Sequence, residues 1–336
     1  MFLLVITLFF SLACVGPSPA QKPVPAPTAT RVAFFQHRGI NQQDQITIEP
    51  LCKELGGSVE IVNYKFVNDE TKWFDEKGQR KFDIFILPGG DSWLWFEKIH
   101  GVSTGVGIDE RGCQNIKKFI RNGGSCIGFC FVGPEFFART SIWTGLTGKQ
   151  VDAGVKWAPF VNRMPGVMLR VYGIEPIFRG TVMGPQESNL PYPRARFLSI
   201  RLDMENSIVK KAKLADTVYL FVAGGGSLIP HVDQQIMEVV GWFPNGTAAI
   251  AIVKYGNGHL YMVAPHPNIT LGNSSDWIKG LIAGKVPRRF GLNDQQINEA
   301  VSILDKEGDL DGPAPDLMLT KAILKDAAER ASPLAR

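Results

Sequence analysis

The stretch FDIFILPGG, residues 82–90, restricts the possible folds of this chain more than any other segment. It is a continuous apolar run that stops at two glycines, without alternation of polar and apolar residues. A strand with this pattern is covered on both faces, which is typical of a parallel sheet between two layers of helices. Further candidate strands are RVAFFQ (31–36), VEIVNY (59–64) and SCIGF (125–129).

Segments with helical periodicity separate these strands. Residues 44–56 carry apolar side chains at helical spacing and stop at Gly56 and Gly57, and residues 109–122 form an amphipathic pattern. The order strand, helix, strand, strand, helix, strand predicts an α/β fold with a parallel sheet and helices on both faces.

The second half of the chain has a different rhythm. Between residues 140 and 230, short β segments are separated by proline and glycine clusters, which predicts an antiparallel elaboration of the same sheet. Residues 248–267 follow as two strands around the turn sequence GNG, a hairpin pattern. Residues 294–308 and 314–331 are two expected terminal helices that either dock on the domain or extend from it.

The composition excludes several kinds of partner. Of the 336 residues, 36 are basic and 32 acidic, and they are interspersed, so no basic tract predicts binding to nucleic acid or to an anionic membrane. The cysteines and histidines fit no zinc spacing, and we expect neither a metal nor a cofactor. The expected ligand is a small molecule or peptide whose identity the sequence does not give.

The amino terminus resembles a targeting segment. MFLLVITLFFSLACVG is apolar but too short to span a bilayer comfortably, and it precedes the small residues PSPA. We expect a signal peptide at 1–20, a Pro-rich linker at 21–30 and a secreted protein with no stable membrane span after cleavage. A retained membrane anchor is the alternative. Asn245, Asn268 and Asn273 begin glycosylation triplets, which suit a secreted glycoprotein.

Four cysteines remain after such a cleavage: Cys52, Cys113, Cys126 and Cys130. An oxidising compartment favours disulfides. Cys52 and Cys113 both fall on expected helices and are the expected pair, with Cys126 buried in a strand as a small apolar residue.

Three chemically complementary positions follow three of the expected strands. Gly89 and Gly90 follow the third strand, Cys130 the fourth, and His266 the last. Ligands of doubly wound sheets bind beyond the carboxyl ends of the strands. A thiol needs a base to become a thiolate, and an oxyanion needs fixed backbone donors, so these positions together predict a nucleophilic cysteine site.

The chain resembles the class I glutamine amidotransferase-like superfamily, and most closely the amino-terminal domain of biotin–protein ligases. The segments that carry the resemblance are FDIFILPGGDSW, GCQNIKKFIRNGGSCIGFC, YLFVAGGGS and YGNGHLYMVAPHP, in family order. The resemblance implies a flavodoxin-like parallel sheet, an amidotransferase-like domain over 31–283 and a helical carboxy-terminal extension over 284–336. No biotin-ligase catalytic domain or ammonia-using synthetase domain follows, so neither full activity is expected.

The same resemblance implies roles for individual residues. Cys130 would be the nucleophile, His266 the base, and Asn268 the residue that orients His266. The oxyanion or binding positions are Gly89, Gly90, Phe131 and Gly225.

Two positions depart from the pattern of active amidotransferases. Val132 replaces the second glycine of Gly-x-Cys-x-Gly, and Asn268 replaces the glutamate of His-Pro-Glu. A neutral amide can orient an imidazole but cannot neutralise an imidazolium. Cys130 could also be an inert small residue at a tight turn.

We therefore expect a Cys130–His266 hydrolase of amide or ester bonds that acts through a thioester. One alternative is a catalytically inactive module that binds a small molecule or peptide on the same fold. A further alternative is an accessory protein of a larger complex that docks through its terminal helices.

Overall fold

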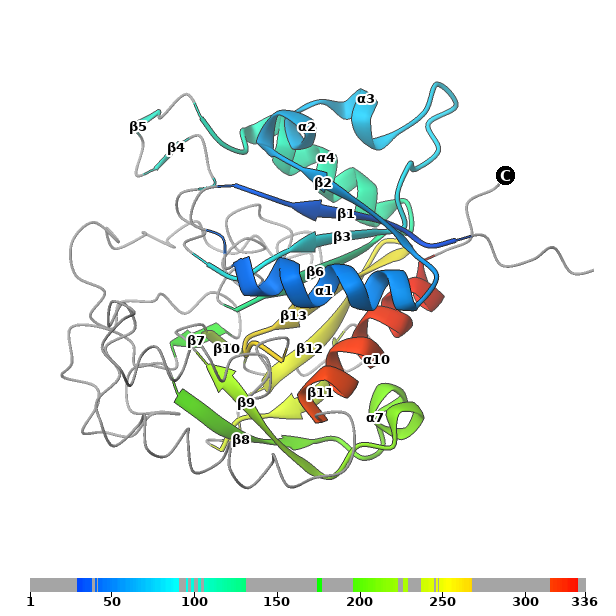
Figure 1. Cartoon of the computed structure of the whole chain (residues 1–336). Coiled ribbons are helices and arrows are strands. Elements are labelled where there is room, and N and C mark those ends of the chain that lie inside the picture. Colours follow the sequence, from blue (N-terminus) through cyan, green and yellow to red (C-terminus); the bar gives the residue numbers. More distant parts are fainter. Residues whose placement is uncertain are drawn as a thin grey trace, which may run out of the picture.

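Five parallel strands form one half of a mixed central sheet (Figure 1). The computed structural model describes residues 29–37, 40, 42–90, 95, 98–99, 102–103, 106–130, 174–176, 196–222, 226–228, 237–244, 246, 248–267 and 315–331. The parallel strands, in sheet order, are β2 (Ser58–Val62), β1 (Arg31–Phe35), β3 (Ile84–Leu87), β6 (Ser125–Phe129) and β13 (Gly258–Val263).

Antiparallel strands continue the sheet beyond β13. They are β12 (Ala248–Tyr255), β11 (Met237–Trp242), β8 (Arg196–Leu202) and β9 (Thr217–Val222), with β10 (Gly226–Leu228) and β7 (Ile174–Pro176) off this path. A separate small sheet pairs β4 (Lys98–Ile99) with β5 (Val102–Ser103). The expected hairpin is confirmed, since β12 and β13 are antiparallel neighbours.

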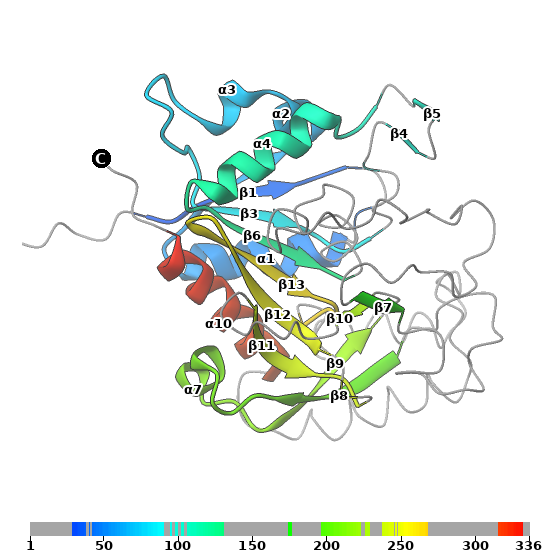
Figure 2. The same cartoon turned by 180° about the vertical axis from the view of Figure 1, so that it is seen from behind.

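Helices cover both faces of the sheet, as the continuous apolar strands predict (Figures 1 and 2). The helices on one face are α1 (Gln42–Glu54), α7 (Ser207–Ala212) and α10 (Pro315–Arg330); those on the other are α2 (Tyr64–Asn68), α3 (Glu70–Trp73) and α4 (Glu110–Arg121). In β1, Val32 and Phe34 enter the first core while Ala33 and Phe35 enter the second. This alternation follows from the two-residue period of a strand.

Helix α10 is part of the first core. Its side chains Leu319, Ile323, Leu324 and Ala327 are at most 1% exposed. The second expected terminal helix therefore docks on the sheet, and Figure 1 shows it lying across β13 and β12. The first, at 294–308, lies outside the described residues, as do the expected signal peptide and the three glycosylation asparagines.

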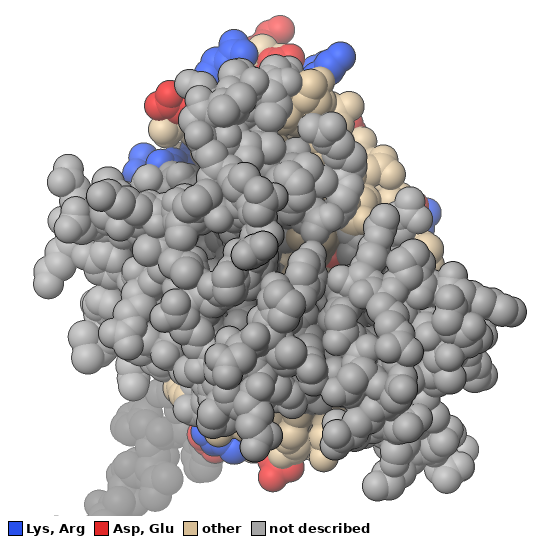
Figure 3. Space-filling model, turned by 90° about the vertical axis from the view of Figure 1, so that its left-hand side faces the viewer, with Lys and Arg blue, Asp and Glu red and all other residues tan. Residues whose placement is uncertain are grey.

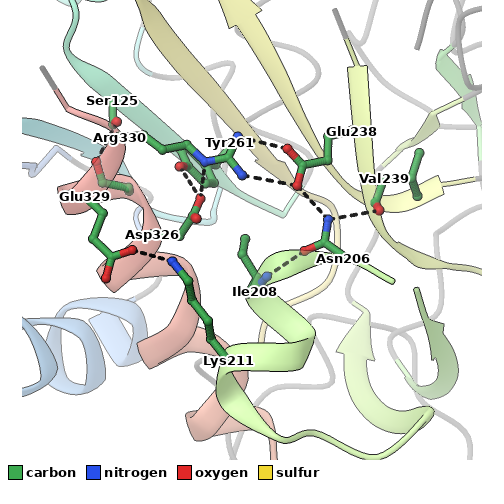
Figure 4. A network of polar contacts seen from close by, with 11 residues as sticks. Ser125, Asn206, Ile208, Lys211, Glu238, Val239, Tyr261, Asp326, Glu329 and Arg330 are labelled. Carbon is green, nitrogen blue, oxygen red and sulfur yellow. Dashed lines mark hydrogen bonds and ion pairs between the residues drawn. The ribbon is translucent and has the colours of Figure 1, made fainter. Parts of the chain in front are cut away.

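A polar network fixes α10 to the strands beneath it (Figure 4). The Ser125 hydroxyl in β6 donates to the carbonyl of Ala327 at 2.8 Å, and the Tyr261 hydroxyl in β13 donates to Asp326 at 2.7 Å. Arg330 joins Asp326, at 2.7 Å, to Glu238 of β11, at 2.9 Å. Because the Asp326 carboxylate is buried, these partners compensate for its lost hydration.

Within the described residues, none of the helices combines the length and the apolar character that crossing a bilayer requires.

Candidate functional site

Cys130 lies at the turn that ends β6. All five residues of this strand are buried, and Cys130 itself has φ +60°, a left-handed conformation that a residue with a Cβ adopts only at a cost. A strained turn of this kind is what raises a nucleophile out of a sheet edge. Cys130 is buried, with 4% of its surface exposed.

His266 follows β13, the immediate neighbour of β6. The two strands are parallel, with Val263 opposite Phe129, so the residues that come after them leave the same edge of the sheet. His266 is 3% exposed and forms a side-chain hydrogen bond with Cys130. The thiol and the imidazole, 136 positions apart in the chain, are thus in contact.

A third side chain, from helix α1, completes the cluster. Asp44 lies in the first turn of α1 and is fully buried. Its Oδ1 lies 3.5 Å from His266 Nδ1, and its Oδ2 accepts a short hydrogen bond from the backbone N–H of Gly89. The carboxylate therefore contacts both the imidazole and the glycine turn after β3.

The charge of His266 is set by opposing effects. Burial alone would lower the pKa of His266, and it is the largest single effect. Electrostatic attraction to Cys130 and to Asp44, whose Oδ1 lies 3.5 Å from Nδ1, acts in the other direction and raises the pKa of His266 to about 10. The raised pKa favours the imidazolium form of His266 at neutral pH.

Gly89 fits this cluster because it has no side chain. A Cβ at this position would lie 2.2 Å from His266 Cε1 and 3.0 Å from both Cys130 Cβ and Asp44 Oδ2. The next residue, Gly90, has φ +135° and forms a β-bridge with Ile40. Gly89 is thus needed for the close approach of the turn to Cys130 and His266, and the positive φ of Gly90 favours glycine there.

The structure brings together Cys130, His266, Gly89 and Gly90 from the sequence-predicted set. Phe131, Asn268 and Gly225 lie outside the described residues, so their expected roles stay predictions. Sequence reasoning missed Asp44. The available signal was an acidic residue in the first turn of the helix after β1, since the chain leaves β1 at the same sheet edge as Cys130.

The expected Cys52–Cys113 disulfide is wrong. The four described cysteines form no disulfide with one another, and Cys52 packs into the core on the α1 face while Cys113 packs against the core on the α4 face. The sheet separates them, so no rotamer change joins the two sulfurs. Burial raises the pKa of Cys52 to about 12 and raises that of Cys126 further. Both are therefore neutral thiols near pH 7.

Figure 3 views the side toward which the parallel strands point, and acidic and basic side chains both occur at its upper and lower margins. Among the described residues, no group of three His, Cys, Asp or Glu side chains is arranged to hold a metal ion.

No family model and no curated protein matches this sequence. Among solved structures, a glutamine amidotransferase from Thermotoga maritima is 12% identical, with 90% of this chain and 99% of that chain covered and a TM-score of 0.49. A glutamine amidotransferase from Methylobacillus flagellatus is 8% identical, with coverages of 89% and 94% and a TM-score of 0.45. A cytoplasmic protein from Salmonella typhimurium is 11% identical, with coverages of 76% and 98% and a TM-score of 0.39.

Structures similar to this chain thus include glutamine amidotransferases.

Proposed function

We propose that this chain is a cysteine-dependent hydrolase of amide or ester bonds, built on a flavodoxin-like sheet of the glutamine amidotransferase-like type. The observation that carries the proposal is the contact between Cys130, held at φ +60° on a strand end, and the buried His266. A strained thiol beside a protonated imidazole is the arrangement that nucleophilic cysteines require. The finer resemblance, to biotin–protein ligase amino-terminal domains, stays a prediction.

The first half-reaction would form a thioester. The Cys130 thiolate attacks the carbonyl carbon of the substrate and forms an S–C bond, and the carbonyl oxygen takes up the negative charge. His266 then gives its proton to the leaving amine or alcohol, and the C–N or C–O bond breaks. With Nδ1 on the Asp44 side, Nε2 is the nitrogen that serves the reaction.

The second half-reaction would restore the enzyme. Neutral His266 takes a proton from water, and the resulting hydroxide attacks the thioester carbonyl. The C–S bond breaks, the acid leaves, and the thiolate and imidazolium are again paired. The expected oxyanion donors are the backbone N–H groups of Gly90 and Phe131, because the Gly89 N–H is bonded to Asp44.

The same Gly89 contact favours a second candidate function. An amide already engaged by a carboxylate cannot stabilise an oxyanion, as expected for an inactive module that binds a small molecule or peptide on the same fold. The two functions differ in one measurable respect, the reactivity of the Cys130 thiol.

Alkylation of the native protein tests the proposal. Iodoacetamide at pH 7, followed by peptide mass mapping, should modify Cys130 at least about 10-fold faster than Cys52 or Cys126, whose buried thiols are neutral. An activated ester should then transfer its acyl group to Cys130 and form a thioester. The variant Cys130→Ser should form no thioester. Equal, slow modification of all three cysteines would refute the hydrolase and leave the binding module.

Secretion is a separate proposal that rests on the sequence alone. It predicts that an expressed full-length chain is recovered outside the cell with an amino terminus near residue 21. Recovery of an uncleaved chain in a membrane fraction would instead indicate the retained anchor.

A further inference from the structure

The Asp44 carboxylate is buried more completely than its position in the chain explains. A carboxylate in the first turn of a helix normally stays near solvent, where it interacts with the helix dipole. Asp44 has no exposed surface at all. Burying a carboxylate is costly unless it is hydrogen-bonded and paired, so the partners of Asp44 indicate why it is there.

The two carboxylate oxygens face two different parts of the candidate site. Oδ2 accepts the N–H of Gly89, in the turn that an added Cβ would make too crowded for His266. Oδ1 lies 3.5 Å from His266 Nδ1. One side chain thus contacts the glycine turn after β3 and the histidine after β13, two elements that are not adjacent in the sheet.

We propose that Asp44 is the positioning residue of this site: its carboxylate holds the His266 ring with Nδ1 protonated, and it stabilises the imidazolium that pairs with the Cys130 thiolate. The inference rests on the proposed function and deepens it. It assigns to a residue of α1 the role that the sequence pattern gives to Asn268.

The charge of Asp44 is what distinguishes this role from that of an amide. An amide at Asn268 can accept a hydrogen bond from an imidazole, but it supplies no negative charge. Within the described residues, the titratable groups that act on His266 are Cys130 from the end of β6 and Asp44 from α1. Removing the Asp44 charge therefore leaves the imidazolium with the thiolate as its one described anionic neighbour.

The experiment compares Asp44→Asn with a matched control, Asp326→Asn. Both positions are buried carboxylates on helices of the same face, but Asp326 bonds to Tyr261 and Arg330, not to His266. The main readout is the pH at which His266 loses its proton, followed together with its tautomer by nitrogen NMR of the imidazole. The rate of Cys130 alkylation by iodoacetamide at pH 7 is measured beside it.

For Asp44→Asn we expect the His266 imidazole to lose its proton at a pH about one unit or more below the wild-type value, the effect of removing one nearby opposite charge. A displacement of one pH unit is about a 10-fold change in the protonation equilibrium of His266. Asp326→Asn should be less stable to heat but should keep the wild-type titration of His266.

The outcomes distinguish a failure of the proposed function from a failure of the proposed role of Asp44. If wild-type Cys130 is no more reactive than Cys52, the proposed function fails. If wild-type Cys130 is reactive but His266 titrates in Asp44→Asn as it does in the wild type, only the role of Asp44 fails.

Wild-type NMR covers the case in which Asp44→Asn does not fold. It should show His266 still protonated at pH 8, and a His266 that is already neutral there would overturn the inference without any variant.

Discussion

Replacement of Gly89 by alanine tests the geometry of the site most directly. The added Cβ would lie 2.2 Å from His266 Cε1, whereas carbon atoms in contact are about 3.5 Å apart, so the ring or the turn has to move by about 1.3 Å. Gly89 does not have a positive φ, and an alanine therefore meets no backbone penalty there. The effect of the substitution comes from crowding alone.

The expected cost divides between stability and reactivity. Forcing a methyl group into a packed site costs about 1–3 kcal/mol of the free energy of unfolding. A displacement of about 1 Å at a reacting group lowers a rate by about 100-fold. We therefore expect Gly89→Ala to fold with a lower melting temperature and to lose most of the selective alkylation of Cys130 by iodoacetamide.

Gly78→Ala is the control for lost stability. Gly78 has φ +74°, so alanine is strained there by about 1–2 kcal/mol, but its Cβ would meet no atom within 4 Å. The two variants should therefore melt at similar temperatures and differ in Cys130 reactivity. If Gly89→Ala alkylates at the wild-type rate, the contact between the glycine turn and His266 does not position the reacting groups.

Other predictions concern the core, the polar network and the thiols. Leu319→Ala, in the buried face of α10, should lower the free energy of unfolding by about 2–5 kcal/mol in denaturant titrations, and a loss under about 1 kcal/mol would contradict the docking of this helix. Tyr261→Phe removes the donor to Asp326 and should cost about 1–3 kcal/mol by the same measurement, where no loss would mean that water replaces the hydroxyl. Peptide mapping without reductant should find Cys52 and Cys113 as free thiols, and a linked peptide pair would contradict the structure.

The parallel part of the sheet could be predicted because the residue pattern of its strands fits one kind of sheet. Runs such as IFIL at 84–87 are apolar at every position, and that pattern requires cover on both faces. Once the strands are parallel, the residues after them have to meet at one edge. Cys130 and His266 could therefore be placed together before any coordinates were known.

The disulfide could not be predicted for a related reason. Helical periodicity identifies the buried stripe of a helix, but it does not say which face of the sheet that stripe packs against. Cys52 in α1 and Cys113 in α4 lie on opposite faces because their crossovers share one hand but run in opposite directions along the sheet, from β1 to β2 and from β3 to β6. The periodicity of the sequence does not give this strand order.

In the role proposed for Asp44, a catalytic arrangement would be complete in space although its sequence pattern is broken. The sequence pattern of active amidotransferases has a carboxylate two residues after the histidine, and this chain has Asn268 at that position. The chemistry requires only an anion beside Nδ1 of His266, and such groups are recognised by geometry, not by their order in the chain. Helix α1 starts at the carboxyl end of β1, and its first turn puts a carboxylate 3.5 Å from that nitrogen. On the proposed role of Asp44, an amide at position 268 does not argue against catalysis, because the negative charge that the amide lacks would come from α1.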